Sequence, residues 1–108
     1  MDRPPRPAPQ PLTGPNGEPL PPEVERVLRG FFKDGRLTTI PAKERKRLVV
    51  LRYLRDQVFT EDRTYPEAEV NQRLALFHRD VAALRRSMVD AGLVTRSAGE
   101  YRRVDDDF

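Results

Sequence analysis

The 108-residue sequence contains no cysteine and no tryptophan, and it has a single histidine, His78. Without cysteine the chain can form no disulfide, thiolate nucleophile or cysteine-ligated metal site. No histidine–carboxylate cluster surrounds His78, so we expect no metal ion or other cofactor, and we expect the histidine to cap or pack a turn. Glycine-rich phosphate loops and nucleophile elbows are also missing, and the sequence therefore predicts a protein that is not an enzyme.

Long hydrophobic runs are absent as well. No apolar stretch approaches the roughly 18 residues that a membrane span needs, and the N-terminus lacks the pattern of a signal peptide. We therefore expect a cytoplasmic protein without a membrane partner. Only 37% of the residues are hydrophobic and the mean hydropathy is −0.72, which predicts a small core with solvated ends.

Proline is concentrated at one end of the chain. Residues 1–22 hold nine of the eleven prolines and show no periodic apolar face, so this segment is predicted to be a disordered, proline-rich tail. Residues 23–104 carry the apolar periodicity and are predicted to form one domain. Residues 105–108, which begin with three aspartates, are predicted to be an acidic tail.

Positive charge is concentrated in the predicted domain. Residues 23–104 have 18 basic and 12 acidic side chains, a net charge of +6. This balance is compatible with a polyanionic partner. A charge-rich, solvated surface is an equally good interpretation of the charge alone.

Apolar spacing of three and four residues predicts two helices in the first half of the domain. The first begins at Glu23 and is followed by Gly35 as its stop signal, and a short β-prone run, 36–40, ends at Pro41. The second helix is predicted over 42–57. The apolar positions of the first helix are Val24, Val27, Leu28, Phe31 and Phe32, and those of the second are Leu48, Val50, Leu51, Leu54 and Val58.

The second half of the domain predicts a helix pair and a hairpin. Tyr65-Pro66 is predicted to start the third helix, whose apolar positions are Ala68, Val70, Leu74 and Phe77, and the turn into the next helix falls between Leu74 and His78. The fourth helix is predicted within residues 77–92, opening at Arg79-Asp80 and ending at Gly92, with Phe77, Val81, Leu84, Met88 and Ala91 as its apolar stripe. Residues 93–96 and 100–104 are expected to pair across the turn 97–99.

The order of these elements predicts an α+β fold that is mostly α. It corresponds to a winged helix-turn-helix with an extra N-terminal helix and a two-stranded C-terminal wing.

The blocks FFKDGRLTTIPAKERKRLVVLRYL, YPEAEVNQRL, HRDVAALRRSMVDAGLVTR and GEYRRV resemble a bacterial family known as domain of unknown function 2087. The resemblance covers residues 24–104. It implies a winged-helix-like domain that occurs alone or attached to ArsR-type transcriptional regulators, and therefore a role linked to transcription. The segment DVAALRRSMVDAGLVTR is also similar to the recognition helix and wing entry of MarR- and ArsR-type repressors.

The leading hypothesis is a winged-helix nucleic-acid-binding module, with duplex DNA favoured and RNA possible. Arg79 and Arg86 stand seven residues apart on the polar face of the fourth helix, so both can enter a major groove. Asp80 beside them would repel a phosphate. The remaining candidate contacts are Arg85 on the helix, Arg102 and Arg103 on the hairpin, and Lys43, Arg45, Lys46 and Arg47 at the start of the second helix.

Two alternatives remain open. The first is a protein-interaction or homodimerisation module, whose seam would be the stripe Val24, Leu28, Phe31 and Phe32. Structured RNA or the ribosome is a further partner that the same basic face fits, and the sequence does not separate it from DNA.

Overall fold

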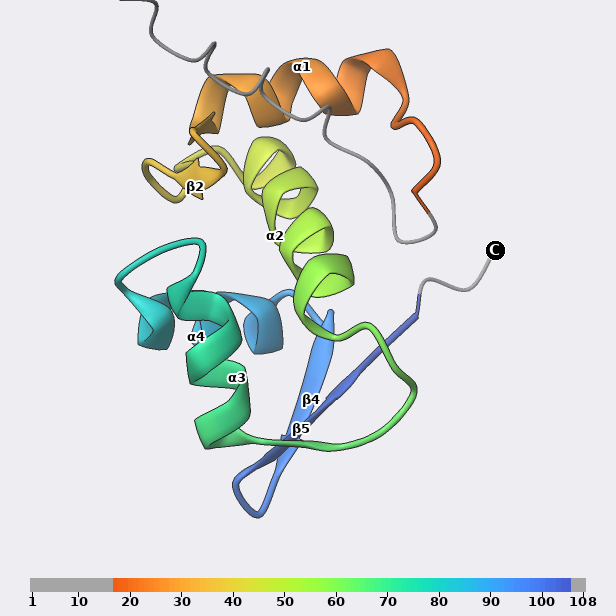
Figure 1. Ribbon diagram of the computed structural model, residues 1–108, viewed down its shortest axis with the longest axis vertical. Coiled ribbons are helices and arrows are strands. Elements are labelled where there is room, and N and C mark those ends of the chain that lie inside the picture. The colour runs from red at the N-terminus through yellow and green to blue at the C-terminus, as the bar shows by residue number, and fades with distance from the viewer. Residues whose placement is uncertain (1–16, 106–108) are drawn as a thin grey trace, which may run out of the picture.

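The computed structural model describes residues 17–105, and these form an α+β fold of four helices and two small antiparallel sheets. Figure 1 shows α1 lying across one end of the long helix α2, with α3, α4 and the C-terminal hairpin gathered at the other end. The elements are α1 (Pro22–Phe31), β1 (Phe32–Lys33), β2 (Arg36–Leu37), α2 (Glu44–Val58), β3 (Tyr65–Pro66), α3 (Glu67–Ala75), α4 (Val81–Asp90), β4 (Val94–Ser97) and β5 (Glu100–Arg103).

The first helix begins with Pro22, where a missing N–H costs nothing because the first amides of a helix have no intrahelical acceptor. Leu28 is fully buried. The segment ahead of the helix is part of the packing as well, since Leu20 is partly buried against the core. The boundary predicted at residue 22 therefore divides a packed segment. Residues 1–16 of the predicted tail lie outside the described residues.

The predicted helix stop at Gly35 is wrong, because α1 already ends at Phe31. Gly35 instead lies in a hairpin between β1 and β2, in which Lys33 pairs with Arg36. Asp34 and Gly35 have φ angles of 52° and 78°, as a two-residue type I′ turn requires. An Asp-Gly pair is one of the strongest local signals for such a hairpin, and it was available in the sequence.

The second helix confirms most of its predicted apolar face. Val50, Leu51, Leu54 and Val58 are fully buried, whereas Leu48 is only half-buried. The prediction of a buried side chain was therefore less accurate for Leu48, because this residue lies near the border of the apolar stripe. The helix lies between α1 on one side and α3 and α4 on the other.

The third helix begins at Glu67, two residues later than predicted. Tyr65 and Pro66 form β3 instead, and Tyr65 pairs with Tyr101 of β5. The predicted apolar positions Val70 and Leu74 are fully buried, but Ala68 is exposed. The sheet therefore has three strands, in the spatial order β3-β5-β4, where the sequence predicted only the two strands of the hairpin.

The fourth helix begins at Val81, directly after Arg79-Asp80, where it was predicted to open. Asp80 is its N-cap, and the carboxylate accepts a hydrogen bond from the backbone N–H of Ala83 at 3.1 Å. Gly92, with φ of 73°, follows the helix as predicted and takes the left-handed conformation that ends it. Leu84 and Met88 of the predicted stripe are fully buried.

The C-terminal hairpin is confirmed with a shorter turn than predicted. Ser97 pairs with Glu100, so only Ala98 and Gly99 form the loop, with φ angles of 52° and 76°. Both positive angles are those of a type I′ turn, which matches the twist of the two strands. The hairpin packs on the core through Val94 and Tyr101, which are 2% exposed.

Candidate nucleic-acid interface

The fourth helix presents a polar face opposite its buried stripe. Arg79, just before the helix, and Ala82 and Arg86 within it are exposed. Among the described residues, neither Arg79 nor Arg86 has a hydrogen-bond or ion-pair partner. Asp80 faces the backbone as an N-cap, and this role explains the carboxylate next to Arg79. The face therefore offers two unpaired guanidinium groups on one rigid element.

The neighbouring candidate Arg85 is engaged inside the molecule. Nη1 of Arg85 donates to Oε1 of Glu67 at 2.5 Å and to the hydroxyl of Tyr101 at 2.9 Å. The Tyr101 hydroxyl in turn donates to the same Glu67 oxygen at 2.8 Å. The hydrogen bond from Tyr101, followed by the charges of Arg85 and Arg96, lowers the pKa of Glu67 below its ordinary value. Arg85 thus fixes α4 to the start of α3.

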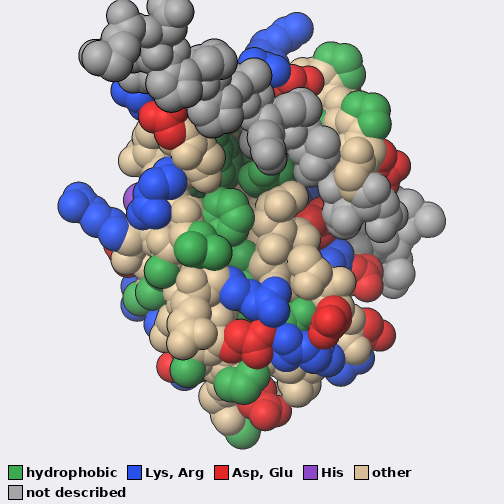
Figure 2. Space-filling model, viewed as in Figure 1, with side chains coloured by type: hydrophobic (Ala, Val, Ile, Leu, Met, Phe, Trp, Pro, Cys, Tyr) green, Lys and Arg blue, Asp and Glu red, His purple; other side chains and the backbone are tan. Residues whose placement is uncertain are grey.

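The two hairpin arginines differ from each other. Arg103 is 14% exposed in its side chain, and its guanidinium contacts Asp56, Asp105 and the carbonyl oxygen of Phe59 at 2.9, 2.7 and 2.6 Å. It joins β5 to the end of α2. Arg102 is 47% exposed and forms an ion pair with Asp62. In Figure 2 basic and acidic side chains are interspersed over the lower half of the visible face. The predicted acidic tail beyond Asp105 lies outside the described residues.

The basic cluster before and within the first turn of α2 is exposed. Lys43, Arg45 and Lys46 have no hydrogen-bond or ion-pair partner within residues 17–105. Arg47 is half-buried and donates to the carbonyl oxygen of Ala42 at 2.8 Å. The α2 N-terminus lacks a side-chain cap, so three cations lie beside uncapped backbone N–H groups. An anion bound there would be attracted both by the cations and by the backbone N–H groups.

Two further side chains support this surface: Arg36, which the sequence did not single out, and His78, which was predicted to cap or pack a turn. Arg36 donates to the carbonyl oxygens of Ala75 and Leu76 at 3.3 and 3.1 Å and so caps the C-terminus of α3. Nδ1 of His78 lies 3.1 Å from the carbonyl oxygen of Leu37, and this contact packs the α3–α4 turn on β2. Figure 2 shows basic side chains projecting beside this histidine. A basic residue in a short strand carries no local signal that it caps a helix about 40 residues away.

A third set of contacts holds the loop before β3. Arg63 lies over the ring of Tyr65, with Cζ 3.7 Å from the ring centroid, and forms ion pairs with Glu61 and Glu69. The hydrogen bond to Arg63 lowers the pKa of Glu69. Arg73 lies over the same ring and donates to the carbonyl oxygen of Val58 at 2.9 Å. Arg63 and Arg73 therefore stabilise the folded domain.

The seam proposed for dimerisation is largely used within the chain. Leu28 is fully buried, and Val24, Phe31 and Phe32 are partly buried against the core. The Phe32 ring meets the Tyr53 ring edge-on, with the centroids 5.3 Å apart. Less apolar surface is left for a partner than the sequence alone suggested.

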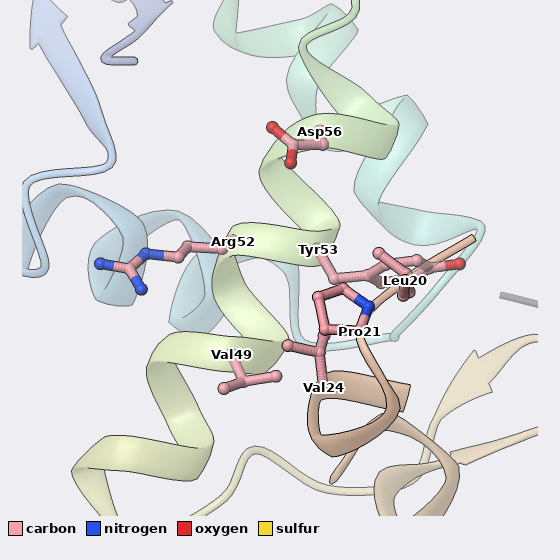
Figure 3. Close-up of a pocket in the computed structure, with 7 residues that line it drawn as sticks. All are labelled: Leu20, Pro21, Val24, Val49, Arg52, Tyr53 and Asp56. Atoms are coloured by element: carbon pink, nitrogen blue, oxygen red, sulfur yellow. The ribbon is translucent and has the colours of Figure 1, made fainter. Parts of the chain in front are cut away.

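Two hollows open on the described surface. The first, about 170 Å³, is mostly apolar and lies between the start of α1 and the middle of α2. In Figure 3 Leu20 and Pro21 lie beside the Tyr53 ring, whereas Arg52 extends away from them. The second, about 370 Å³, is a polar cleft between α4 and the β4–β5 hairpin. Arg85, Arg86 and Arg96 line it, together with Glu67 and Asp90.

Within residues 17–105 there is no group of three or more His, Asp or Glu side chains placed to hold a metal ion. The same residues include no helix whose length and hydropathy suit a membrane span.

The structure therefore defines a small α+β domain with a basic helix face and a polar cleft beside it. The chain belongs to a family of uncharacterized proteins conserved in bacteria, DUF2087, which it matches over residues 36–103. The match begins at β2, so α1 and β1 precede it, and it is shorter at the N-terminus than the resemblance over 24–104. No curated protein and no solved structure matches the chain.

Proposed function

We propose that residues 44–103 form a winged helix-turn-helix. The order of elements supports this architecture: α2, β3, α3, α4, then the β4–β5 hairpin. In it α3 and α4 are the helix-turn-helix, α4 is the recognition helix, and the hairpin is the wing. The third strand, β3, pairs with β5 and ties the start of α3 to the wing, so helix and wing keep a fixed relative position.

We further propose that this domain binds nucleic acid, with duplex DNA as its preferred partner. The single observation that carries the proposal is that the arginines on and beside α4 differ in whether they have a partner within the domain. Arg85 is held by Glu67 and Tyr101, whereas Arg79 and Arg86 are exposed and unpaired within the described residues. An arginine without an internal partner retains its full fork of donors for guanine edges or phosphates.

Lys43, Arg45 and Lys46 supply the electrostatic part of this proposal. Exposed cations near a helix N-terminus attract phosphate without reading sequence. Arg102 adds a weaker contribution because Asp62 shares its charge. About five phosphate contacts would give a slope near −5 in a plot of log affinity against log salt concentration.

The test is a gel-retardation titration of the full chain with a random 30-base-pair duplex at about 50–100 mM salt. We expect binding by the unmodified protein and a loss of at least tenfold in Arg79→Ala/Arg86→Ala. Arg26→Ala/Arg29→Ala removes the same charge from α1, at the far end of α2, and should retain most of the affinity. Equal losses in both variants would contradict the role of α4, and no binding to duplex at low salt would contradict the proposal.

The same titration with a hairpin RNA and with a single strand separates DNA from RNA binding. The protein-interaction alternative is tested by light scattering of the full chain across a concentration series. Because the Val24–Phe32 stripe is mostly packed within the chain, we expect a monomer in the absence of nucleic acid.

A further inference from the structure

The polar cleft beside α4 is built from four elements that meet only in the folded chain. Arg86 and Asp90 come from α4, Arg96 from β4, Tyr101 from β5 and Glu67 from the start of α3. Its volume of about 370 Å³ lies in the range of small-ligand sites in proteins. The cleft is therefore a concave site lined by charged side chains.

The cleft has more basic than acidic side chains, and the basic ones differ in whether they have partners within the domain. Three arginines face two carboxylates, a net charge of +1. Glu67 is hydrogen-bonded to Arg85, and Arg86 has no hydrogen-bond or ion-pair partner among the described residues. Arg96 has a longer contact, 3.6 Å, to the same carboxylate, and its Cζ lies 5.9 Å from the centre of the Tyr101 ring. One guanidinium group from α4 and one from β4 thus line the cleft with donors that an anion could use.

The walls are held in place before any ligand arrives. Arg85, Glu67 and the Tyr101 hydroxyl are mutually hydrogen-bonded, joining α4, α3 and β5 at the back of the cleft. The Nε of Arg85 is buried behind these contacts and has no hydrogen-bond partner within residues 17–105. A site whose donors are fixed in advance loses less conformational entropy when it binds.

We propose that this cleft binds a phosphate group, with Arg86 and Arg96 as the two donors that reach it. Tetrahedral dianions and phosphodiesters accept several hydrogen bonds at once, and the guanidinium fork matches their oxygens. The inference deepens the proposed function and rests on it for the source of the phosphate, a backbone phosphodiester of nucleic acid clamped between helix and wing. A free phosphorylated molecule offers the same chemistry.

The direct test is a titration of the ¹⁵N-labelled full chain with pyrophosphate at constant ionic strength, followed by backbone amide shifts. We expect saturable shifts in residues 82–90 and 94–101. Arg96→Ala should weaken binding about tenfold, and it should fold normally because its side chain is 56% exposed. Asp90→Asn removes a repulsive carboxylate and should strengthen binding about twofold, whereas Glu23→Gln, an equal change of charge on α1, should alter it little.

A second measurement identifies the source of the phosphate. If a duplex supplies it, Arg96→Ala lowers the magnitude of the salt slope by about one. If pyrophosphate saturates the cleft but Arg96→Ala leaves the salt slope unchanged, the ligand of the cleft is a small phosphorylated molecule. The same conclusion holds if pyrophosphate binds and no nucleic acid binds at all. In that case the phosphate cleft is supported, whereas the proposal of nucleic-acid binding is contradicted. If pyrophosphate shifts no cleft amide and the slope is unchanged, the inference is overturned while duplex binding through Arg79 can still hold.

Discussion

Nη2 of Arg103 lies 2.9 Å from Oδ1 of Asp56, and this contact links the last strand to a helix 47 residues earlier in the chain. Asp56 also accepts from Arg55, whose Nη1 donates to the carbonyl oxygen of Val104 at 2.9 Å. An arginine that the sequence offered as a phosphate contact is thus part of a partly buried network that closes the domain.

Because of this network, Arg103→Ala should lower the free energy of unfolding by about 2 kcal/mol. The loss comes from removing the donor to the Phe59 carbonyl and one of the two arginine donors to Asp56, in a site where the side chain of Arg103 is 14% exposed. Arg102→Ala, one residue earlier, removes the same charge from an exposed position and should change stability by less than about 0.5 kcal/mol. Urea denaturation of both variants measures the difference, and equal effects would show that the network contributes nothing.

Asp80 allows charge and capping to be separated. Asp80→Ala should cost about 1 kcal/mol, because the N–H of Ala83 loses its acceptor. Asp80→Asn keeps an oxygen at the cap and should leave stability nearly unchanged. If α4 binds nucleic acid as proposed, Asp80→Asn should also raise duplex affinity by removing a negative charge beside Arg79. A loss of stability in Asp80→Asn equal to that in Asp80→Ala would contradict the capping role.

The carboxylate of Glu67 should report on the Tyr101 hydroxyl. Tyr101→Phe removes the hydrogen bond that lowers the pKa of Glu67, so that pKa should rise toward its ordinary value of 4.5. An NMR titration of the side-chain carboxyl carbon measures it directly. A pKa that does not move in Tyr101→Phe would show that Arg85 and Arg96 alone hold the carboxylate.

The same depressed pKa values predict an acid-sensitive fold. Glu67 and Glu69 both have lowered pKa values in the folded state. Their stabilisation is therefore complete above the ordinary carboxyl pKa and is lost as the pH falls through the lowered folded values. Thermal denaturation from pH 7 down to pH 3 should show a falling midpoint below about pH 4.5, and Glu67→Gln/Glu69→Gln should flatten this decline.

The C-terminal hairpin turn gives a pair of substitutions of opposite sign. Gly99 has φ of 76°, so Gly99→Ala should destabilise by about 1 kcal/mol. Its neighbour Ala98 has φ of 52°, a conformation that asparagine adopts more readily, so Ala98→Asn should stabilise by about 0.5 kcal/mol. Thermal midpoints that shift in the same direction for both variants would exclude the type I′ turn.

Local sequence patterns were enough to predict the features that depend on neighbouring residues. The stripe that includes Leu84 and Met88 placed the buried face of α4, and Gly92 marked its end. These signals are local, because helical period and left-handed backbone preference are read within a few residues. The Asp34-Gly35 hairpin was equally local, but its glycine was interpreted as a helix stop.

Which arginines have partners within the domain depends on contacts between segments that are distant in the sequence. Arg85 and Glu67 are 18 residues apart, and Arg103 and Asp56 are 47 apart, so neither pairing leaves a trace in local composition. Strand β3 was hidden for the same reason, since Tyr65 becomes a strand residue only by pairing with Tyr101. An ion pair or a sheet edge depends on which distant segments meet. The sequence supplied a list of nine basic candidates, and folding divided it into side chains that hold the domain together and a few, Arg79 and Arg86 first among them, that face outward.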